Sequence, residues 1–213
     1  AADTPAGVLA AYHRLTGKPE NVPLWSLGAW ISRAYYRDEA DIMATAREVR
    51  ERRFPADVIT FDGRAWQDTP TRFHFSFDPS RYPDPARVIG ALKALDYKIC
   101  CWEYPLVSVD HPQYRKYEQQ GYFLRRSDGS ELVFEWDTGK KTTPFGPTLT
   151  PLPPSGLVDF TNPAAYAWWR DSHRALWALG VDTIKSDFGE QVPADALAHN
   201  GDSGARLHNV NAH

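Results

Sequence analysis

This sequence has little excess charge, no long apolar run and no spaced cysteines, and each of these absences excludes a class of protein. The net charge is only -3 and the Lys and Arg residues are scattered, so we expect no nucleic-acid partner. No apolar run approaches the roughly 20 residues that cross a bilayer, so we expect no membrane partner. The first residues contain no basic segment followed by an apolar one, which predicts no signal peptide and a cytoplasmic protein.

Metal and cofactor motifs are also missing. The two cysteines, Cys100 and Cys101, are adjacent in an apolar run, so a bond between them would be strained and we interpret them as small core residues. The histidines, including His74, His173 and His208, show no ligand spacing; we interpret them as surface or helix residues and predict no metal. No Gly-rich phosphate loop follows the first predicted strand, and no cofactor is expected.

Aromatic side chains, in contrast, are abundant, with 8 Trp, 10 Tyr and 10 Phe. A large core explains most of them. A carbohydrate site, where flat sugar faces stack on rings, is the other explanation. Composition cannot separate the two, so the positions of the rings must decide.

Strand-like and helix-like segments alternate along the chain. N-cap residues begin three helices at Asp38, Asp84 and Asn162, and Pro85 and Pro163 follow in two first turns. A lead-in helix is predicted at 5–16, within residues 1–20. Strands are predicted at 22–32, 58–62, 98–102 and 181–187. Helices are predicted to start at 38 and at 84, to span 110–120, and to run from 162 to Gly180. Residues 122–160 form a long insertion with one strand-like patch at 132–136, and the tail from Gln191 has no confident element.

Four strand–helix units joined by short turns predict a parallel sheet in an α/β fold. The candidates are an open doubly wound sheet and the N-terminal half of a (β/α)8 TIM barrel, because a closed barrel needs eight units. In both folds the active site lies at the carboxyl ends of the strands.

The residues at these strand ends are acids, a lysine and flat rings. Asp62 ends the second strand, Trp102 the third, and Lys185 and Asp187 the fourth. Lys185 and Asp187 lie two residues apart and therefore share one strand face, whereas Glu103 should point away from Trp102 toward a helix or loop. Acids beside flat rings suit glycoside cleavage, where carboxylates stabilise an oxocarbenium-like transition state.

Each residue also has a structural explanation. Asp62 at a strand end is often a loop cap, and Trp102 is often barrel packing. Lys185 at a strand end also suits a Schiff-base aldolase, which remains an alternative from a different enzyme class.

The motif Lys185-Ser186-Asp187-Phe188-Gly189-Glu190 resembles the nucleophile motif of glycoside hydrolase family 31, which contains α-glucosidases and α-xylosidases. The Lys-x-Asp-Phe-Gly-Glu form is closer to the bacterial α-xylosidase branch. Other segments resemble the family in the same order: 23–30, 61–62, 77–79, 98–100 and 159–163.

The resemblance implies residue roles and a barrel fold. Asp187 would be the nucleophile, Asp62 and Lys185 would bind sugar hydroxyls, Trp102 would wall the subsite, and Tyr35 would lie near the substrate entrance.

Two departures from the xylosidase branch affect the sugar pocket. Gly63-Arg64 replaces its usual Cys-Phe, and Glu103-Tyr104-Pro105 replaces the usual Ile-Asn-Pro. Arg64 is a candidate to bind a charged or extra-hydroxylated group, although a surface loop Arg is the simpler explanation.

Residues 1–213 thus resemble a partial catalytic barrel, with the family's N-terminal β-sandwich before it and the general acid/base on a later strand. By itself the chain should be inactive. The hypotheses are a retaining α-xylosidase acting on small oligosaccharides or α-glycosides, an α-glucosidase or other α-glycosidase, and a non-catalytic carbohydrate-binding remnant. Barrels of this family often associate, so the full-length protein is a candidate homo-oligomer.

Overall fold

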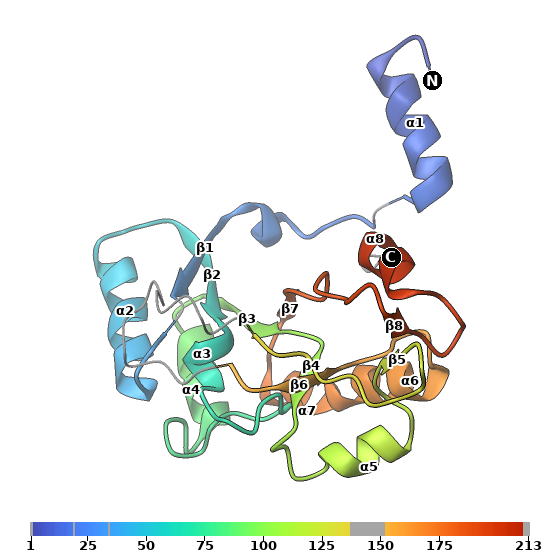
Figure 1. Ribbon diagram of the computed structural model, residues 1–213. Coiled ribbons are helices and arrows are strands. Elements are labelled where there is room, and N and C mark those ends of the chain that lie inside the picture. The colour runs from blue at the N-terminus through green and yellow to red at the C-terminus, as the bar shows by residue number, and fades with distance from the viewer. Residues whose placement is uncertain (1, 19, 34, 137–151, 211–213) are drawn as a thin grey trace.

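The computed structural model describes residues 2–18, 20–33, 35–136 and 152–210 (Figure 1). The elements follow in the order α1 (Pro5–Thr16), η1 (Leu24–Leu27), β1 (Ala29–Arg33), α2 (Glu39–Glu51), β2 (Ala56–Phe61), α3 (Gly63–Trp66), α4 (Pro85–Lys93), β3 (Lys98–Glu103), β4 (Leu106–Ser108), α5 (Tyr114–Gln119), β5 (Arg125–Arg126), β6 (Ser155–Leu157), α6 (Pro163–Ser172), α7 (Arg174–Leu179), β7 (Thr183–Ser186), β8 (Ala196–Leu197) and α8 (Gly204–Val210).

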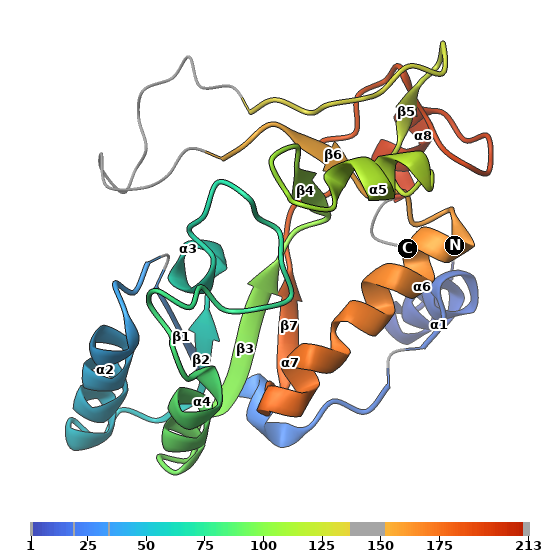
Figure 2. The same cartoon turned by 90° about the horizontal axis from the view of Figure 1, so that it is seen from below.

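A four-stranded parallel sheet organises the chain, in the order β1-β2-β3-β7 (Figure 2). Thr60 of β2 lies opposite Ser32 of β1 on one side and Cys100 of β3 on the other. Trp102 of β3 lies opposite Lys185 of β7. The predicted set of four parallel strands with connecting helices is therefore confirmed, and all four carboxyl ends meet at one edge of the sheet.

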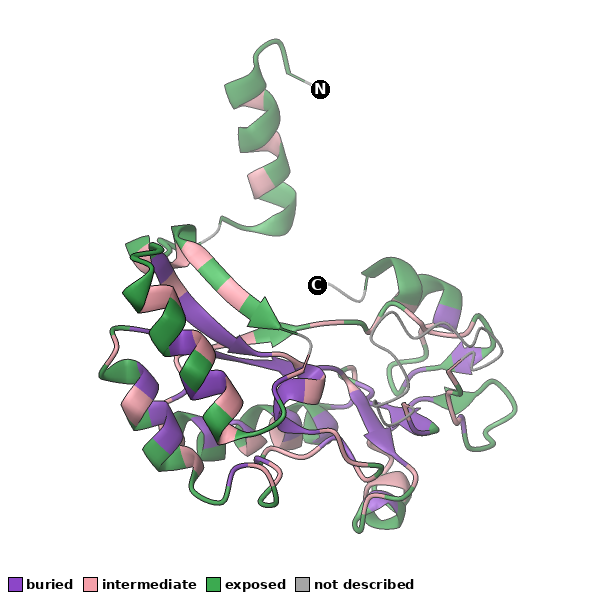
Figure 3. Ribbon diagram, turned by 90° about the vertical axis from the view of Figure 1, so that its left-hand side faces the viewer, coloured by how far each residue is buried: buried purple, intermediate pink, exposed green. Residues whose placement is uncertain are grey.

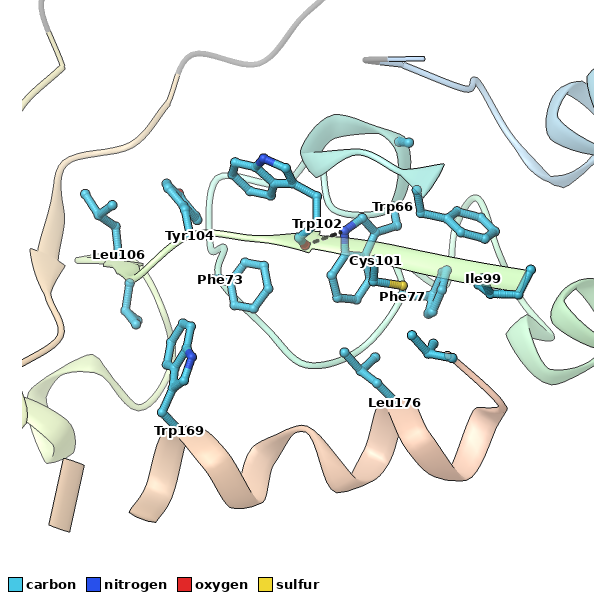
Figure 4. Close-up of a cluster of buried hydrophobic side chains, with 14 of the residues drawn as sticks. Trp66, Phe73, Phe77, Ile99, Cys101, Trp102, Tyr104, Leu106, Trp169 and Leu176 are labelled. Atoms are coloured by element: carbon cyan, nitrogen blue, oxygen red, sulfur yellow. Dashed lines mark hydrogen bonds between the residues drawn. The ribbon is translucent and has the colours of Figure 1, made fainter. Parts of the chain in front are cut away.

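The core lies on one face of this sheet. Ile59 and Cys101 are fully buried there, in the same cluster as Leu92 of α4 and Leu176 of α7. Figure 4 shows Cys101 and Ile99 facing the helix that carries Leu176, while Trp102 points to the other side of β3. All residues of β2 and β3 except Asp57 and Lys98 are buried, and burial is lower along β1 (Figure 3). Strand alternation thus separates a packed outer face from an inner face that carries the polar side chains.

Helix starts follow the predicted caps. The side chains of Asp38, Asp84 and Asn162 accept backbone N–H groups of their own first turns. The helical segment that begins at Asn162 ends at Gly180, whose φ of 95° lies in the left-handed region that glycine adopts easily. This segment is not one helix, however, because α6 ends at Ser172 and α7 begins after His173.

Several predicted boundaries are wrong. Residues 24–27 form a 3-10 turn instead of the first part of a strand, and β1 covers only Ala29–Arg33. The helix predicted at 110–120 begins at Tyr114, because Asp110 and His111 lie in a turn closed by the Ser108 side chain. Residues 132–136 make only one ladder bridge, between Phe134 and Ser155, instead of a strand.

Several short elements escaped prediction, among them α3 directly after Asp62, β4 before α5, and β8 and α8 in the tail after Gln191. None of these is longer than seven residues, so each is too short to show a periodic apolar pattern. Of the predicted insertion at 122–160, residues 137–151 lie outside the described part.

The N-terminal helix α1 stands away from the sheet (Figure 1). Its predicted extent is confirmed, but none of its residues is buried. Across the described residues, every helix is too short or too polar to traverse a bilayer.

Candidate active site

Four predicted site residues meet at the carboxyl ends of β2, β3 and β7. The Lys185 Nζ lies 3.1 Å from Asp62 Oδ2 and 3.5 Å from Asp187 Oδ2, so one ammonium links two carboxylates. The Trp102 Nε1–H donates to the same Asp187 oxygen over 2.7 Å. Parallel register explains this meeting: Trp102 lies opposite Lys185, and Asp187 follows two residues later on the same face.

Asp62 caps a helix with one carboxylate oxygen and bonds Lys185 with the other. Its Oδ1 accepts the Gly63 backbone N–H over 2.9 Å and so caps α3. Its Oδ2 takes the Lys185 bond and a longer one from the Ser32 hydroxyl, at 3.4 Å. Capping fixes the carboxylate rotamer, which leaves the second oxygen directed at Lys185.

Asp187 is held by backbone as well as side-chain contacts. Its N–H donates to the Glu103 carbonyl over 2.9 Å, and its Oδ1 accepts the Phe188 N–H over 3.1 Å. Phe188 has a φ of 58° and Gly189 a φ of 99°, so the chain turns sharply directly after the carboxylate. A positive φ is uncommon for a bulky residue and costs energy, which is typical of functional loops.

The electrostatics favour a charged lysine. Burial disfavours the ammonium, but the hydrogen bond to Asp62 and the charges of Asp62 and Asp187 outweigh it, so the pKa of Lys185 is raised. A protonated amine cannot add to a carbonyl, and this weighs against the Schiff-base alternative.

A group of aromatic rings stands beside Asp187. The Phe188 ring centroid lies 6.0 Å from that of Trp102 in an edge-to-face arrangement, and 5.1 Å from that of Trp136. Tyr104 lies 4.9 Å from Trp102 and 6.4 Å from Trp136. Four rings from three segments of the chain therefore form one wall next to the carboxylate.

Gly63 makes room for the Trp102 ring. A Cβ added to Gly63 would lie 2.6 Å from Trp102 Cε3 and 2.7 Å from Cζ3, closer than real Cβ atoms approach. The replacement of the usual Cys of the xylosidase branch by Gly63 therefore has a structural consequence, because the indole occupies the space that a side chain would take.

Tyr35 and Arg64 do not join this cluster. The half-buried Tyr35 ring has the Arg81 guanidinium 4.9 Å from its centroid. Arg64 lies in α3 and bonds Asp68 over 3.1 Å, with its side chain only 17% exposed. It is thus no exposed loop residue, and its place in α3 directly after Gly63 keeps it near the site.

Glu103 points away from Trp102, as the strand alternation predicts. Its Oε2 lies 2.7 Å from His173 Nε2, between α6 and α7. His173 is 9% exposed and has helical backbone at the junction of α6 and α7, so of its two interpretations the surface residue is wrong and the helix residue holds. Among the described residues, no group of three or more His, Cys, Asp or Glu could hold a metal, and Cys100 and Cys101 are both free and buried.

Sequence reasoning missed Ser32, Phe188 and His173. Ser32 could have been found, since it lies two residues after Trp30 and therefore on the same face of the first strand. Only the register between strands, however, places Ser32 beside Asp62. A cleft of about 430 Å³ lies beside β7 and is lined by Phe188 and Trp169 among others, but not by Asp62, Lys185 or Asp187. The polar cluster and this cleft are therefore separate features of the described structure.

Comparison with known proteins gives one consistent result. The family model for the "Glycosyl hydrolases family 31 TIM-barrel domain" matches residues 19–213. An α-xylosidase of Emericella nidulans is 33% identical over 211 residues, which are 98% of this chain and 25% of that protein. The α-xylosidase XylQ of Lactiplantibacillus pentosus is 31% identical over 209 residues, 97% of this chain and 26% of that protein.

Solved structures agree on the fold. A family 31 dextranase of Flavobacterium johnsoniae, complexed with glucose, superposes with a TM-score of 0.84 at 24% identity and covers 99% of this chain and 25% of its own. The chain thus spans about a quarter of the length of the proteins that it matches.

Proposed function

The chain belongs to glycoside hydrolase family 31, and from that premise we propose that the full-length protein is a retaining α-glycoside hydrolase, most simply an α-xylosidase. The observation that carries the proposal is the bonding of Asp187, whose carboxylate is oriented by Trp102 and by its own following N–H. A nucleophile must be aimed, and these contacts fix the direction of the carboxylate.

Asp187 would attack the anomeric carbon and form a covalent glycosyl-enzyme. Lys185 places its ammonium 3.5 Å from one oxygen of that carboxylate. Asp62 and Lys185, which bond each other, would exchange that contact for bonds to sugar hydroxyls. The partner acid of a retaining pair lies about 5–5.5 Å from the nucleophile, and the resemblance places it on a later strand of the full-length protein.

The remaining roles follow from position. The Trp102 ring and the neighbouring wall would bound the sugar being cleaved, and Tyr35 would lie toward the entrance. Arg64 would recognise a charged or extra-hydroxylated substituent, since it directly follows Gly63 in α3 and its side chain is half-buried. The departures at Gly63 and Tyr104 favour a pocket different from that of the xylosidase branch, so α-glucosidase or another α-glycosidase specificity is the second candidate.

The test uses the full-length protein and p-nitrophenyl α-xyloside and α-glucoside. Asp187→Ala should lower kcat by several orders of magnitude, because the covalent route loses its first step. Azide should partly restore turnover by occupying the vacated space, and the rescued azide product should have inverted configuration.

Labelling identifies the nucleophile directly. A 5-fluoro glycosyl fluoride should label the peptide that carries Asp187 in the wild type. A label on Asp62 or Glu190, or near-normal turnover of Asp187→Ala, would overturn the assignment. Sugar binding by the wild type without any hydrolysis would instead support the carbohydrate-binding remnant.

A further inference from the structure

A buried acid–base pair, Glu103 and His173, lies on the face of β3 opposite Trp102. Glu103 is the last residue of β3 and is 7% exposed, and His173 separates α6 from α7 and is 9% exposed. Their Oε2 and Nε2 atoms are 2.7 Å apart.

The bonds of the pair determine where its proton lies. The His173 Nδ1 is 2.8 Å from the Trp169 carbonyl oxygen, which can only accept, so Nδ1 carries a hydrogen. An ionised Glu103 can also only accept, and then Nε2 must carry a second hydrogen. The bond therefore holds one proton between Nε2 and Oε2, and loss of that proton would leave the Nε2 lone pair facing the Glu103 carboxylate.

Glu103 also bonds Asp187 through its backbone. The Glu103 carbonyl oxygen accepts the Asp187 N–H over 2.9 Å, and the preceding residue, Trp102, donates to the Asp187 carboxylate over 2.7 Å. Residues 102 and 103 thus bond Asp187 at two points. The side chain of Glu103 fixes this strand end from the opposite face, through His173, to the junction of α6 and α7.

We propose that Glu103 and His173 are positioning residues, whose side-chain bond holds the end of β3 so that Trp102 and the Glu103 carbonyl aim the Asp187 carboxylate. The inference rests on the proposed function of Asp187 as nucleophile. The Glu103 and His173 side chains meet on the face of β3 opposite Trp102, so loss of the bond should affect the attack step and leave ground-state binding by Asp62 and Lys185 nearly unchanged.

Few other charges face the pair in the described structure. The Cys101 thiol lies near Glu103, and burial raises its pKa well above the usual value, so it stays neutral. The Phe75, Trp169 and Trp177 rings pack around the imidazole. The charged neighbours along the helices, Arg170, Asp171 and Arg174, are exposed and bond one another, and His74 stacks on His111 instead.

The pair therefore gives the attack step a pH dependence. Burial disfavours the imidazolium, but the hydrogen bond to Glu103 and its charge outweigh burial, so the pKa of His173 is raised above its usual value. A raised folded-state pKa means that the pair is complete below about 6.5, the value in the unfolded chain, and is lost as the pH rises through the folded-state pKa. Attack should weaken in that alkaline window.

The experiment measures covalent labelling of the full-length protein by 5-fluoro-α-D-xylopyranosyl fluoride or its glucosyl counterpart. Fluoride departs without a general acid, so the labelling rate reports attack by Asp187. His173→Ala and Glu103→Ala should lower the saturated labelling rate about tenfold at an unchanged half-saturating concentration, because a small misplacement of a nucleophile is costly. Glu103→Gln should label at nearly the wild-type rate, because its amide can donate to a neutral His173.

The pH profile separates positioning from general stability. Wild-type labelling should slow toward alkaline pH, whereas Glu103→Gln, which lacks the carboxylate, should show no such decline. Ser172→Ala is the matched control. It removes a partly buried hydrogen bond at the same helix junction, from the Ser172 hydroxyl to the Trp168 carbonyl over 2.7 Å, and this variant should label normally.

Three results would overturn the positioning role: wild-type labelling rates in both Ala variants, a loss in Glu103→Gln equal to that in Glu103→Ala, or an alkaline decline that persists in Glu103→Gln. If the Ala variants do not fold, the pH profile of Glu103→Gln still decides. A wild type that takes up no label refutes the proposed function, and the positioning role with it, whereas labelling that is insensitive to these variants refutes the positioning role alone.

Discussion

Substitution of Gly63 by alanine tests whether the position of the Trp102 ring controls the nucleophile. The added Cβ would lie 2.6 Å from Trp102 Cε3, about 0.8 Å closer than the 3.4 Å at which ordinary contact begins. Gly63 cannot retreat easily, because its N–H bonds Asp62 and its carbonyl accepts the Gln67 N–H. The indole must therefore move.

Movement of the indole would break its bond to the nucleophile. The Trp102 Nε1 to Asp187 distance is 2.7 Å, and a shift of close to an ångström in the wrong direction takes it to the limit of a hydrogen bond. Misplacement on this scale costs up to about a hundredfold in rate. We expect Gly63→Ala to lower kcat of the full-length protein ten- to a hundredfold, and to cost about 1–3 kcal/mol of stability through overpacking.

The assay combines kcat on p-nitrophenyl α-xyloside and α-glucoside with thermal unfolding. Gly90→Ala is the matched control, since a Cβ there meets nothing within 4 Å and alanine is favoured in the interior of α4. It should keep kcat and gain about 0.5–1 kcal/mol. A Gly63→Ala enzyme with kcat within twofold of the wild type would show that the Trp102 contact does not aim Asp187.

Two further predictions concern the cations of the site. Lys185→Met leaves Asp62 and Asp187 without their shared ammonium. The value of kcat/KM should therefore fall about a hundredfold or more on both glycosides, because a charge-assisted bond and the charge balance are lost. A fall of less than about threefold would show that Lys185 has no role in the site. Arg64→Ala should lower kcat/KM for an α-linked uronide or sulfonated glycoside about tenfold relative to α-xyloside, since a hydrogen bond to a charged group contributes about 1.5–3 kcal/mol; equal ratios across the three substrates would leave Arg64 only as the partner of Asp68.

Local signals predicted most of the fold. Asp38, Asp84 and Asn162 cap helices as their residue types indicate, because capping depends only on the next few residues. The apolar runs of β2 and β3 were clear because both strands are buried. Prediction failed where an element was short, as in α3 and α8, or where a turn interrupted an apolar run, as at residues 24–27. There the outcome depends on packing against distant residues.

The sequence by itself determined that Lys185 and Asp187 share a strand face and that Glu103 points away from Trp102, since alternation is a property of any strand. Only the tertiary structure decided which atoms meet. The Trp102–Asp187 bond, the Ser32–Asp62 contact and the fit of the indole over Gly63 depend on the register between strands separated by many residues. The burial of His173 against Glu103 likewise depends on how α6 and α7 dock on the sheet. Register and docking are set by the packing of the whole core, which no local pattern encodes.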